Sequence, residues 1–77
     1  MPTDIENTFG LELKKLRLER EISQENLAHS SSLDRTYISL LERGLRQPTL
    51  STLFSLCTAL NIKPSEFISK FEDDFFR

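Results

Sequence analysis

The segment SSLDRTYISLLERGLRQP, residues 31–48, predicts a short helix whose outer side carries an unusual set of side chains. With Ile38 and Leu41 placed inward, that side lacks the Lys and Glu that usually coat an exposed helix. The outer side and its flanks hold instead Arg35, Thr36, Tyr37, Ser39, Leu40 and Arg43. Arginine can donate two hydrogen bonds to guanine, Ser and Thr can donate or accept, and an apolar group can meet a thymine methyl. We therefore interpret this helix as a candidate base-reading element, while the exposure of Leu40 also fits solvent contact or a dimer contact.

Three residues are candidates for contacts with DNA phosphates: Gln24, Arg43 and Arg46. Arg43 and Arg46 end the predicted helix and enter the next loop, where a positive charge would also complement the helix dipole. We favour the functional interpretation, in which both clamp phosphates and Arg46 also reaches into a groove to read a base. Gln24 begins the preceding helix, whose free amides suit a phosphate and whose first side chain can add a hydrogen bond.

The remaining reactive residues do not form a recognisable catalytic or metal site. The single histidine (His29) and the single cysteine (Cys57) lie 28 residues apart and do not make a zinc site. We interpret His29 as a solvated helix residue and Cys57 as a small buried hydrophobic residue. The sequence has no glycine-rich phosphate loop, and the acidic run EDD near its end is expected to be solvated. We expect no catalysis, no metal and no cofactor.

Hydrophobic spacing and turn signals predict five short helices, and no alternating strand pattern is present. The helices are expected to begin near Thr8, Ser23, Asp34, Thr49 and Pro64, the first ending near Arg20 and the second near Ser30. Thr8, Ser23, Asp34 and Thr49 are the expected N-caps, although Glu6 or Asn7 could begin the first helix instead. Gly44 and Asn61 are expected to end the third and fourth helices in the left-handed conformation. The predicted fold is an all-α, compact five-helix bundle with a helix-turn-helix.

Length and charge fit one small domain, residues 1–77, with a core at about 8–70 and an acidic, aromatic tail at 71–77. The net charge of −2 at first argues against a nucleic-acid partner. However, residues 8–65 hold eight Lys and Arg against six Asp and Glu, so the body is mildly basic between acidic ends. No apolar run approaches the ~18 residues of a membrane span, and the N-terminus does not resemble a signal peptide. With one cysteine, the sequence favours a cytoplasmic protein.

The C-terminal quarter carries more apolar surface than one short helix can hide, and one interpretation of this surface is a symmetric dimer interface. The candidate interface residues are Ile62, Phe67, Ile68, Phe71 and Phe75. In the alternative interpretation, Phe67 and Ile68 complete the monomer core and Phe75 and Phe76 form a frayed tail. Leu11 and Leu18 form a second apolar stripe on the first helix, either as partly exposed leucines or as a docking strip for the aromatic C-terminus.

The stretch FGLELKKLRLEREISQENLA, followed by LDRTYISLLERGLRQPTLSTLFSLCTALNIKPSEF, closely resembles the lambda-repressor/Cro-like (XRE-type) helix-turn-helix family. The resemblance covers about residues 9–68 and includes the spacing of the landmarks. The matching landmarks are Gly10, Leu13, Arg17, Ser23, Gln24, Leu27, Ala28, Ile38, Glu42, Gly44, Pro48, Leu53, Leu60 and Phe67. The resemblance implies a five-helix domain that binds double-stranded DNA as a homodimer on a near-palindromic operator. It also implies an ion pair between Arg17 and Glu42 that ties the first helix to the recognition helix.

Within this family, a chain of 77 residues has no room for a ligand-sensing domain, so no small-molecule effector is expected. The short acidic chain with LDRTYIS in its recognition helix looks most like the controller (C) proteins of restriction–modification systems. Those proteins regulate their own operon and thereby time expression of the endonuclease. Alternatives are a phage-type or stand-alone repressor, an antitoxin-like regulator, and, from another class, a protein-interaction module that does not touch DNA.

Overall fold

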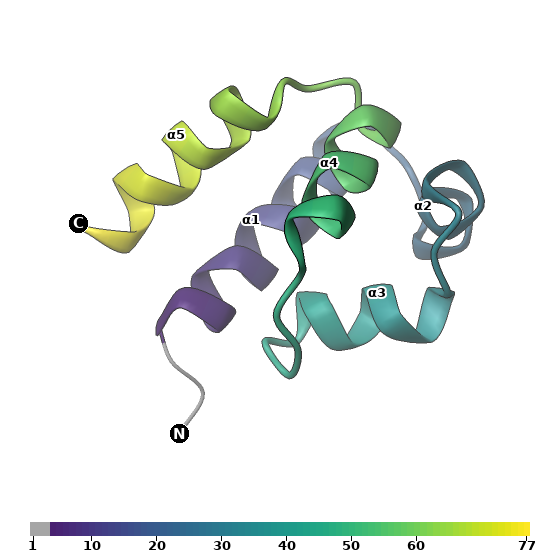
Figure 1. The fold of residues 1–77 in the computed structure, drawn as a ribbon, viewed down its shortest axis with the longest axis horizontal. Coiled ribbons are helices and arrows are strands. Elements are labelled where there is room, and N and C mark those ends of the chain that lie inside the picture. The colour runs from purple at the N-terminus through teal and green to yellow at the C-terminus, as the bar shows by residue number, and fades with distance from the viewer. Residues whose placement is uncertain (1–3) are drawn as a thin grey trace.

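The computed structural model describes residues 4–77 and consists, over that range, of five α-helices without a strand (Figure 1). The helices are α1 (Asp4–Glu19), α2 (Gln24–Ser31), α3 (Arg35–Glu42), α4 (Leu50–Ala59) and α5 (Pro64–Phe75). The predicted all-α five-helix architecture is therefore confirmed. No helix within residues 4–77 is long and apolar enough to cross a membrane.

Helix α1 begins at Asp4, four residues before the expected N-cap Thr8, which lies inside the helix. The expected start was wrong because the apolar pattern continues backwards from Phe9 to Ile5, one helical turn earlier. Ile5 and Phe9 line one apolar groove with residues of α5, so the extra turn has a packing partner. Glu6 also lies near the N-terminus of the helix, where a negative charge is favourable.

The starts of the next three helices agree with the sequence signals. The side chains of Ser23, Asp34 and Thr49 accept hydrogen bonds from the backbone amides of Asn26, Thr36 and Thr52, respectively. Each bond satisfies an amide that has no partner within its own helix. For α5, Pro64 stands in the first turn and Glu66 accepts a hydrogen bond from the Lys63 amide at 3.3 Å.

Four helices end in the same way, with one residue of positive φ followed by a backbone bond back into the last turn. The expected positions Gly44 (φ 74°) and Asn61 (φ 56°) are confirmed. Glu21 (φ 56°) and Ser32 (φ 60°) do the same for α1 and α2, and nothing in their residue types predicted it. These tight ends allow turns of only a few residues between α1, α2 and α3.

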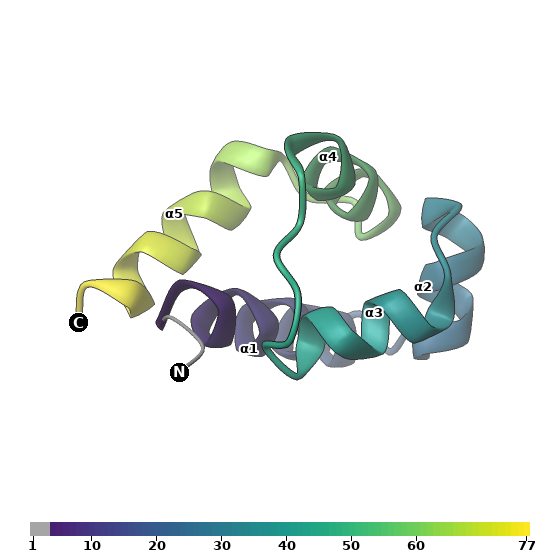
Figure 2. The same ribbon diagram turned by 60° about the horizontal axis from the view of Figure 1, so that its bottom comes forward.

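The core lies where α1 packs against α3 and α5, and α2 packs against α3 and α4 (Figures 1 and 2). Its buried hydrophobic residues are Phe9, Leu13, Leu16, Leu27, Ala28, Ile38, Leu41, Leu53, Leu56, Cys57, Leu60 and Phe67. Gly10 sets the approach of α3 to α1: a Cβ atom there would lie 2.5 Å from the carbonyl oxygen of Leu41 and 2.7 Å from that of Glu42. The C-terminal end of α3 therefore packs directly against the backbone of α1 at Gly10.

The C-terminal segment differs from the sequence expectation in two respects. Helix α5 continues to Phe75, through most of the segment assigned to a tail, and the rings of Phe71 and Phe75 stack at 5.7 Å. Phe67 is only 2% exposed and packs on Phe9, so its assignment to a dimer interface was wrong: it belongs to the monomer core. Leu11 and Leu18 are 67% and 56% exposed, so α5 does not cover them as the docking hypothesis required.

Candidate nucleic-acid interface

Helices α2 and α3 are joined by a three-residue turn, residues 32–34, and α3 runs along one edge of the molecule (Figure 1). Ile38 and Leu41 of α3 are fully buried and hold the helix against α1 and α2. On the opposite side of α3, Arg35, Thr36 and Arg43 are exposed to solvent. The protein therefore presents a short, rigidly anchored helix at its surface, as the sequence predicted.

The structure brings together residues from the two helices that the sequence had grouped as DNA-contacting. Gln24 of α2 and Arg35, Thr36 and Ser39 of α3 line one shallow hollow of about 180 Å³. Arg35 and Thr36 are exposed, and Gln24 and Ser39 are partly exposed. A guanidinium, two hydroxyls and an amide thus share one small surface at the start of α3, which is the end that enters a groove first in helix-turn-helix proteins.

Beneath this hollow lies a buried ion pair between α1 and α3. The Arg17 Nε donates to Glu42 Oε2 at 2.6 Å, and Arg17 Nη2 donates to Glu42 Oε1 at 3.1 Å. The pair that the family resemblance implied is therefore present, and both side chains are less than a tenth exposed. Arg17 Nη1 also donates to the Ile22 carbonyl at 2.8 Å, which ties in the turn before α2.

Gln24 belongs to the same network, which the sequence reasoning missed. Its Nε2 donates to Glu42 Oε1 at 3.0 Å, so the side chain expected to meet a phosphate is oriented by the recognition helix itself. This hydrogen bond orients the Gln24 side chain, so that its amide oxygen and the backbone amides at the start of α2 are held in one fixed arrangement. From the sequence, Glu42 was expected to pair only with Arg17. A carboxylate can accept several hydrogen bonds, and the sequence does not show which other donors lie near it.

Tyr37 has a different environment from the other candidate base-reading residues. It is half-buried, packs against the core, and its hydroxyl donates to the Gln47 carbonyl at 3.4 Å. The side chain therefore connects α3 to the loop that carries Arg46.

Leu40 and Leu45 complete the end of α3. The Leu45 amide donates to the Leu40 carbonyl at 2.9 Å, and the Gly44 amide donates to the Leu41 carbonyl at 3.1 Å. This is the Schellman arrangement, in which the residues at the two positions of Leu40 and Leu45 commonly pack together. A partly exposed leucine at position 40 thus has a structural explanation besides DNA or dimer contact.

The two remaining arginines flank this end of the helix. Arg43 is the C-cap residue of α3 and is exposed, and Arg46 is exposed in the loop, with its Nη1 donating to the Leu45 carbonyl at 2.9 Å. Positive charge is therefore present at both ends of the helix, Arg35 at its start and Arg43 with Arg46 at its end.

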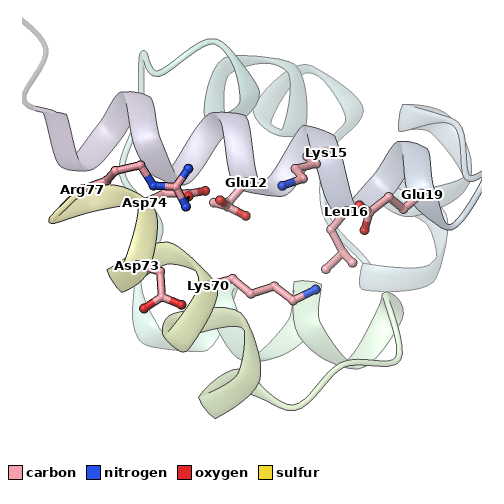
Figure 3. Close-up of a pocket in the computed structure, with 8 residues that line it drawn as sticks. All are labelled: Glu12, Lys15, Leu16, Glu19, Lys70, Asp73, Asp74 and Arg77. Atoms are coloured by element: carbon pink, nitrogen blue, oxygen red, sulfur yellow. Dashed lines mark ion pairs between the residues drawn. The ribbon is translucent and has the colours of Figure 1, made fainter.

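A groove lined mostly by charged residues lies elsewhere, between α1 and the end of α5 (Figure 3). It is lined by Glu12, Lys15, Leu16, Glu19, Lys70, Asp73, Asp74 and Arg77. Charges of both signs alternate around it, and Arg77 pairs with Asp74 at 3.0 Å, so it favours neither an anion nor a cation. Within residues 4–77, no group of three or more His, Cys, Asp or Glu side chains is placed to hold a metal ion.

A short helix anchored by its apolar side, preceded by a second helix and a tight turn, defines a helix-turn-helix domain. The helix-turn-helix family matches residues 13–67, and the chain belongs to that family. Among curated relatives, control protein C.MunI of Mycoplasma sp is 43% identical over 72 residues, which are 92% of this chain and 97% of the relative.

Two solved controller proteins show the same fold. The structure of the restriction-modification controller protein C.AhdI from Aeromonas hydrophila is 44% identical, with a TM-score of 0.77 over 79% of this chain and 92% of that one. The controller protein C.Esp1396I, solved as a tetramer in complex with its natural 35 base-pair operator, is 33% identical. Its TM-score is 0.87 over 95% of this chain and 96% of that one.

Proposed function

We propose that this protein is a sequence-specific regulator of transcription that binds double-stranded DNA as a homodimer on a near-palindromic operator. In this proposal it is the controller protein of a restriction–modification system, acts in the cytoplasm by binding alone, and regulates its own operon to time endonuclease expression. The observation that carries the proposal is the shared hollow of Gln24, Arg35, Thr36 and Ser39. The similarity to controller proteins, one of them solved on its operator, supports the subgroup.

In the proposed complex, α3 enters the major groove, which is about 12 Å wide and admits one helix. Arg35, Thr36 and Ser39 face base edges, with Tyr37, Leu40 and Arg46 at the margins of the contact. Gln24 and the first amides of α2 meet a phosphate on one side, and Arg43 and Arg46 meet phosphates on the other. The Arg17–Glu42 pair does not touch DNA, but it holds the two helices in the required relation.

The experiment is a footprint on the DNA upstream of the protein's own gene, followed by affinity measurements on the protected duplex. Arg35→Ala is expected to weaken binding to this operator by about 10- to 150-fold, the cost of one lost bidentate base contact. Lys14→Ala, which removes an exposed charge from α1, is the matched control and should bind like the parent protein. Equal affinities of Arg35→Ala and Lys14→Ala for the operator would contradict the assignment of α3 as the reading helix.

A further inference from the structure

Glu12 of α1 carries a buried carboxylate whose environment differs from that of Glu42. The two residues are buried to the same degree, Glu12 at 6% exposed and Glu42 at 7%. Glu42 accepts hydrogen bonds from Arg17 and Gln24. The Glu12 carboxylate, by contrast, forms no hydrogen bond or ion pair within residues 4–77. Because a buried carboxylate that lacks a donor has lost hydration without compensation, Glu12 is suited to accept hydrogen bonds from another molecule.

The Glu12 side chain points from α1 into the charged groove between α1 and the end of α5 (Figure 3). The groove has a volume of about 230 Å³, and Leu16, which is also buried, forms an apolar part of its wall. Pockets for drug-sized ligands measure roughly 300–1,000 Å³, so a ligand of this groove must be smaller. The groove therefore offers a small molecule one buried hydrogen-bond acceptor beside an apolar wall.

Two lysines at the edge of the groove carry positive charges that no carboxylate neutralises directly. Lys15 of α1 and Lys70 of α5 line the groove, are exposed, and form no ion pair within residues 4–77. Arg77 also lines the groove, but it is paired with Asp74 at 3.0 Å. In the view of Figure 3, the two lysine ammonium groups lie on the opposite side of Glu12 from Arg77. The groove thus has a buried anionic position and, beside it, a cationic edge.

We propose that this groove binds a small zwitterion that carries an ammonium and a carboxylate group, such as a free α-amino acid. The ammonium donates to the Glu12 carboxylate, and Lys15 and Lys70 hold the ligand carboxylate. A cation without an anionic group would meet the two lysines. An anion without a cationic group would meet Glu12 and the nearby carboxylates of Glu19 and Asp73. A molecule with both charges places each of them against its opposite.

The groove is separate from the surface proposed to bind DNA. Its lining residues come from α1, from α5 and from the C-terminal Arg77, whereas the proposed DNA contacts come from α2, α3 and the loop 43–49. A bound zwitterion would therefore bridge α1 and α5 without covering α3. The zwitterion and operator DNA are expected to bind at the same time, so this inference does not depend on the proposed function.

The first test titrates the full chain with L-valine, whose small apolar side chain suits the wall at Leu16, and follows binding by calorimetry. A Kd on the order of 1 mM is expected for so small a ligand. Two analogues remove one charge each: N-acetyl-L-valine lacks the ammonium, and L-valinamide lacks the carboxylate. Each is expected to bind at least about 10-fold more weakly, since one of the two ionic contacts is lost. No binding of L-valine, or equal binding of either analogue, would overturn the zwitterion site.

The second test locates the site with variants of the chain. Glu12→Gln preserves the size of the buried side chain and is expected to weaken L-valine binding at least about 10-fold. Glu72→Gln makes the same change at an exposed position of α5 outside the groove and should bind L-valine like the parent protein.

Replacing both Lys15 and Lys70 by Gln changes only exposed side chains, so this variant should fold even if Glu12→Gln does not. It is expected to weaken L-valine binding about 3- to 10-fold, the range of two exposed ion pairs. Unchanged L-valine affinity in Glu12→Gln or in the double lysine variant would overturn the site. Operator affinity of the parent protein, measured with and without saturating L-valine, is expected to be unchanged, so failure of this site and failure of DNA binding are seen separately.

Discussion

At the scale of single residues, Glu42 connects the fold to the candidate interface. Its two carboxylate oxygens accept from two Arg17 nitrogens and from Gln24 Nε2, so one side chain fixes α1, α2 and α3 together. The Arg17 guanidinium compensates the negative charge of Glu42, which would otherwise lie close to the surface proposed to bind phosphates. Arg35, by contrast, is exposed and has freedom to adapt to a base edge.

Glu42→Ala is therefore expected to lower the free energy of unfolding by about 3–5 kcal/mol, because it leaves the buried Arg17 without its partner. Arg35→Ala, at an exposed position, is expected to change it by no more than about 0.5 kcal/mol. Urea unfolding of both variants and the parent protein checks this ordering. Equal shifts in the two midpoints would contradict the structural role of the pair.

Cys57 illustrates a residue whose chemistry is suppressed by its place in the core. Burial raises the pKa of its thiol from 9.0 to about 11, and the side chain is 1% exposed. The folded state thus holds the proton more tightly than the unfolded state. The stability contributed by the neutral thiol is fully present below pH 9 and is lost as the pH rises through about 11.

A disulfide reagent at pH 8 should therefore react with native Cys57 at least about 100-fold more slowly than with the urea-unfolded chain, because the thiolate is rarer and shielded. The reaction is followed by the release of the coloured thiol. Immediate stoichiometric reaction of the folded protein would show that the thiol is accessible and that the core around α4 is not packed as described.

At the scale of elements, the contact between α1 and α3 depends on a residue with no side chain. Alanine at position 10 would favour the helix by about 1 kcal/mol on propensity alone. The backbone oxygens of Leu41 and Glu42 stand so close that a Cβ atom forces the two helices apart. The displacement would reach the buried ion pair, since Glu42 supplies one of the two close oxygens and also the carboxylate.

Gly10→Ala is accordingly expected to destabilise the protein by about 1–3 kcal/mol, as overpacking outweighs helix propensity. Lys14→Ala, at an exposed position of the same helix, serves as the comparison and should be close to neutral. Thermal unfolding monitored by circular dichroism distinguishes them. A Gly10→Ala protein as stable as the parent would mean that α1 and α3 are not held at this distance.

The sequence predicted the ends of these helices well where they depend on hydrogen bonds between neighbouring residues. It predicted them less well where they depend on tertiary packing. Ser23, Asp34 and Thr49 cap helices because a short polar side chain bonds the next amides, which can be read directly. The left-handed ends at Glu21 and Ser32 could not be read, since neither residue prefers that conformation and tertiary packing imposes it. The early start of α1 has another cause: Thr8 has the residue type of an N-cap, whereas the apolar pattern continues one turn further back, to Ile5.

The candidate site was predictable to a similar extent. Its residue types and outward placement followed from helical periodicity, and the spacing of Arg17 and Glu42 followed from the family resemblance. The bond from Gln24 to Glu42 and that from Tyr37 to Gln47 depend on how three segments meet in space. Periodicity within one helix does not contain that information. It also could not show that Phe67 faces the monomer core rather than a second copy.

At the scale of the whole molecule, a protein of net charge −2 is proposed to bind a polyanion. The distribution of charge resolves this conflict, because arginines stand at both ends of α3 while acidic residues gather on α5, which packs on α1 and α4. A local basic surface suffices for counterion release, which depends on the phosphates contacted and not on the net charge.

A salt titration of operator binding tests whether α3 and its flanking arginines bind DNA. If Arg43 and Arg46 of each copy neutralise one phosphate each, the logarithm of the binding constant should fall with the logarithm of salt concentration at a slope of about −4. An unrelated duplex of the same length should bind at least about 1,000-fold more weakly at physiological salt. A slope near zero, or equal affinity for the two duplexes, would contradict the account of α3 as a DNA-reading helix.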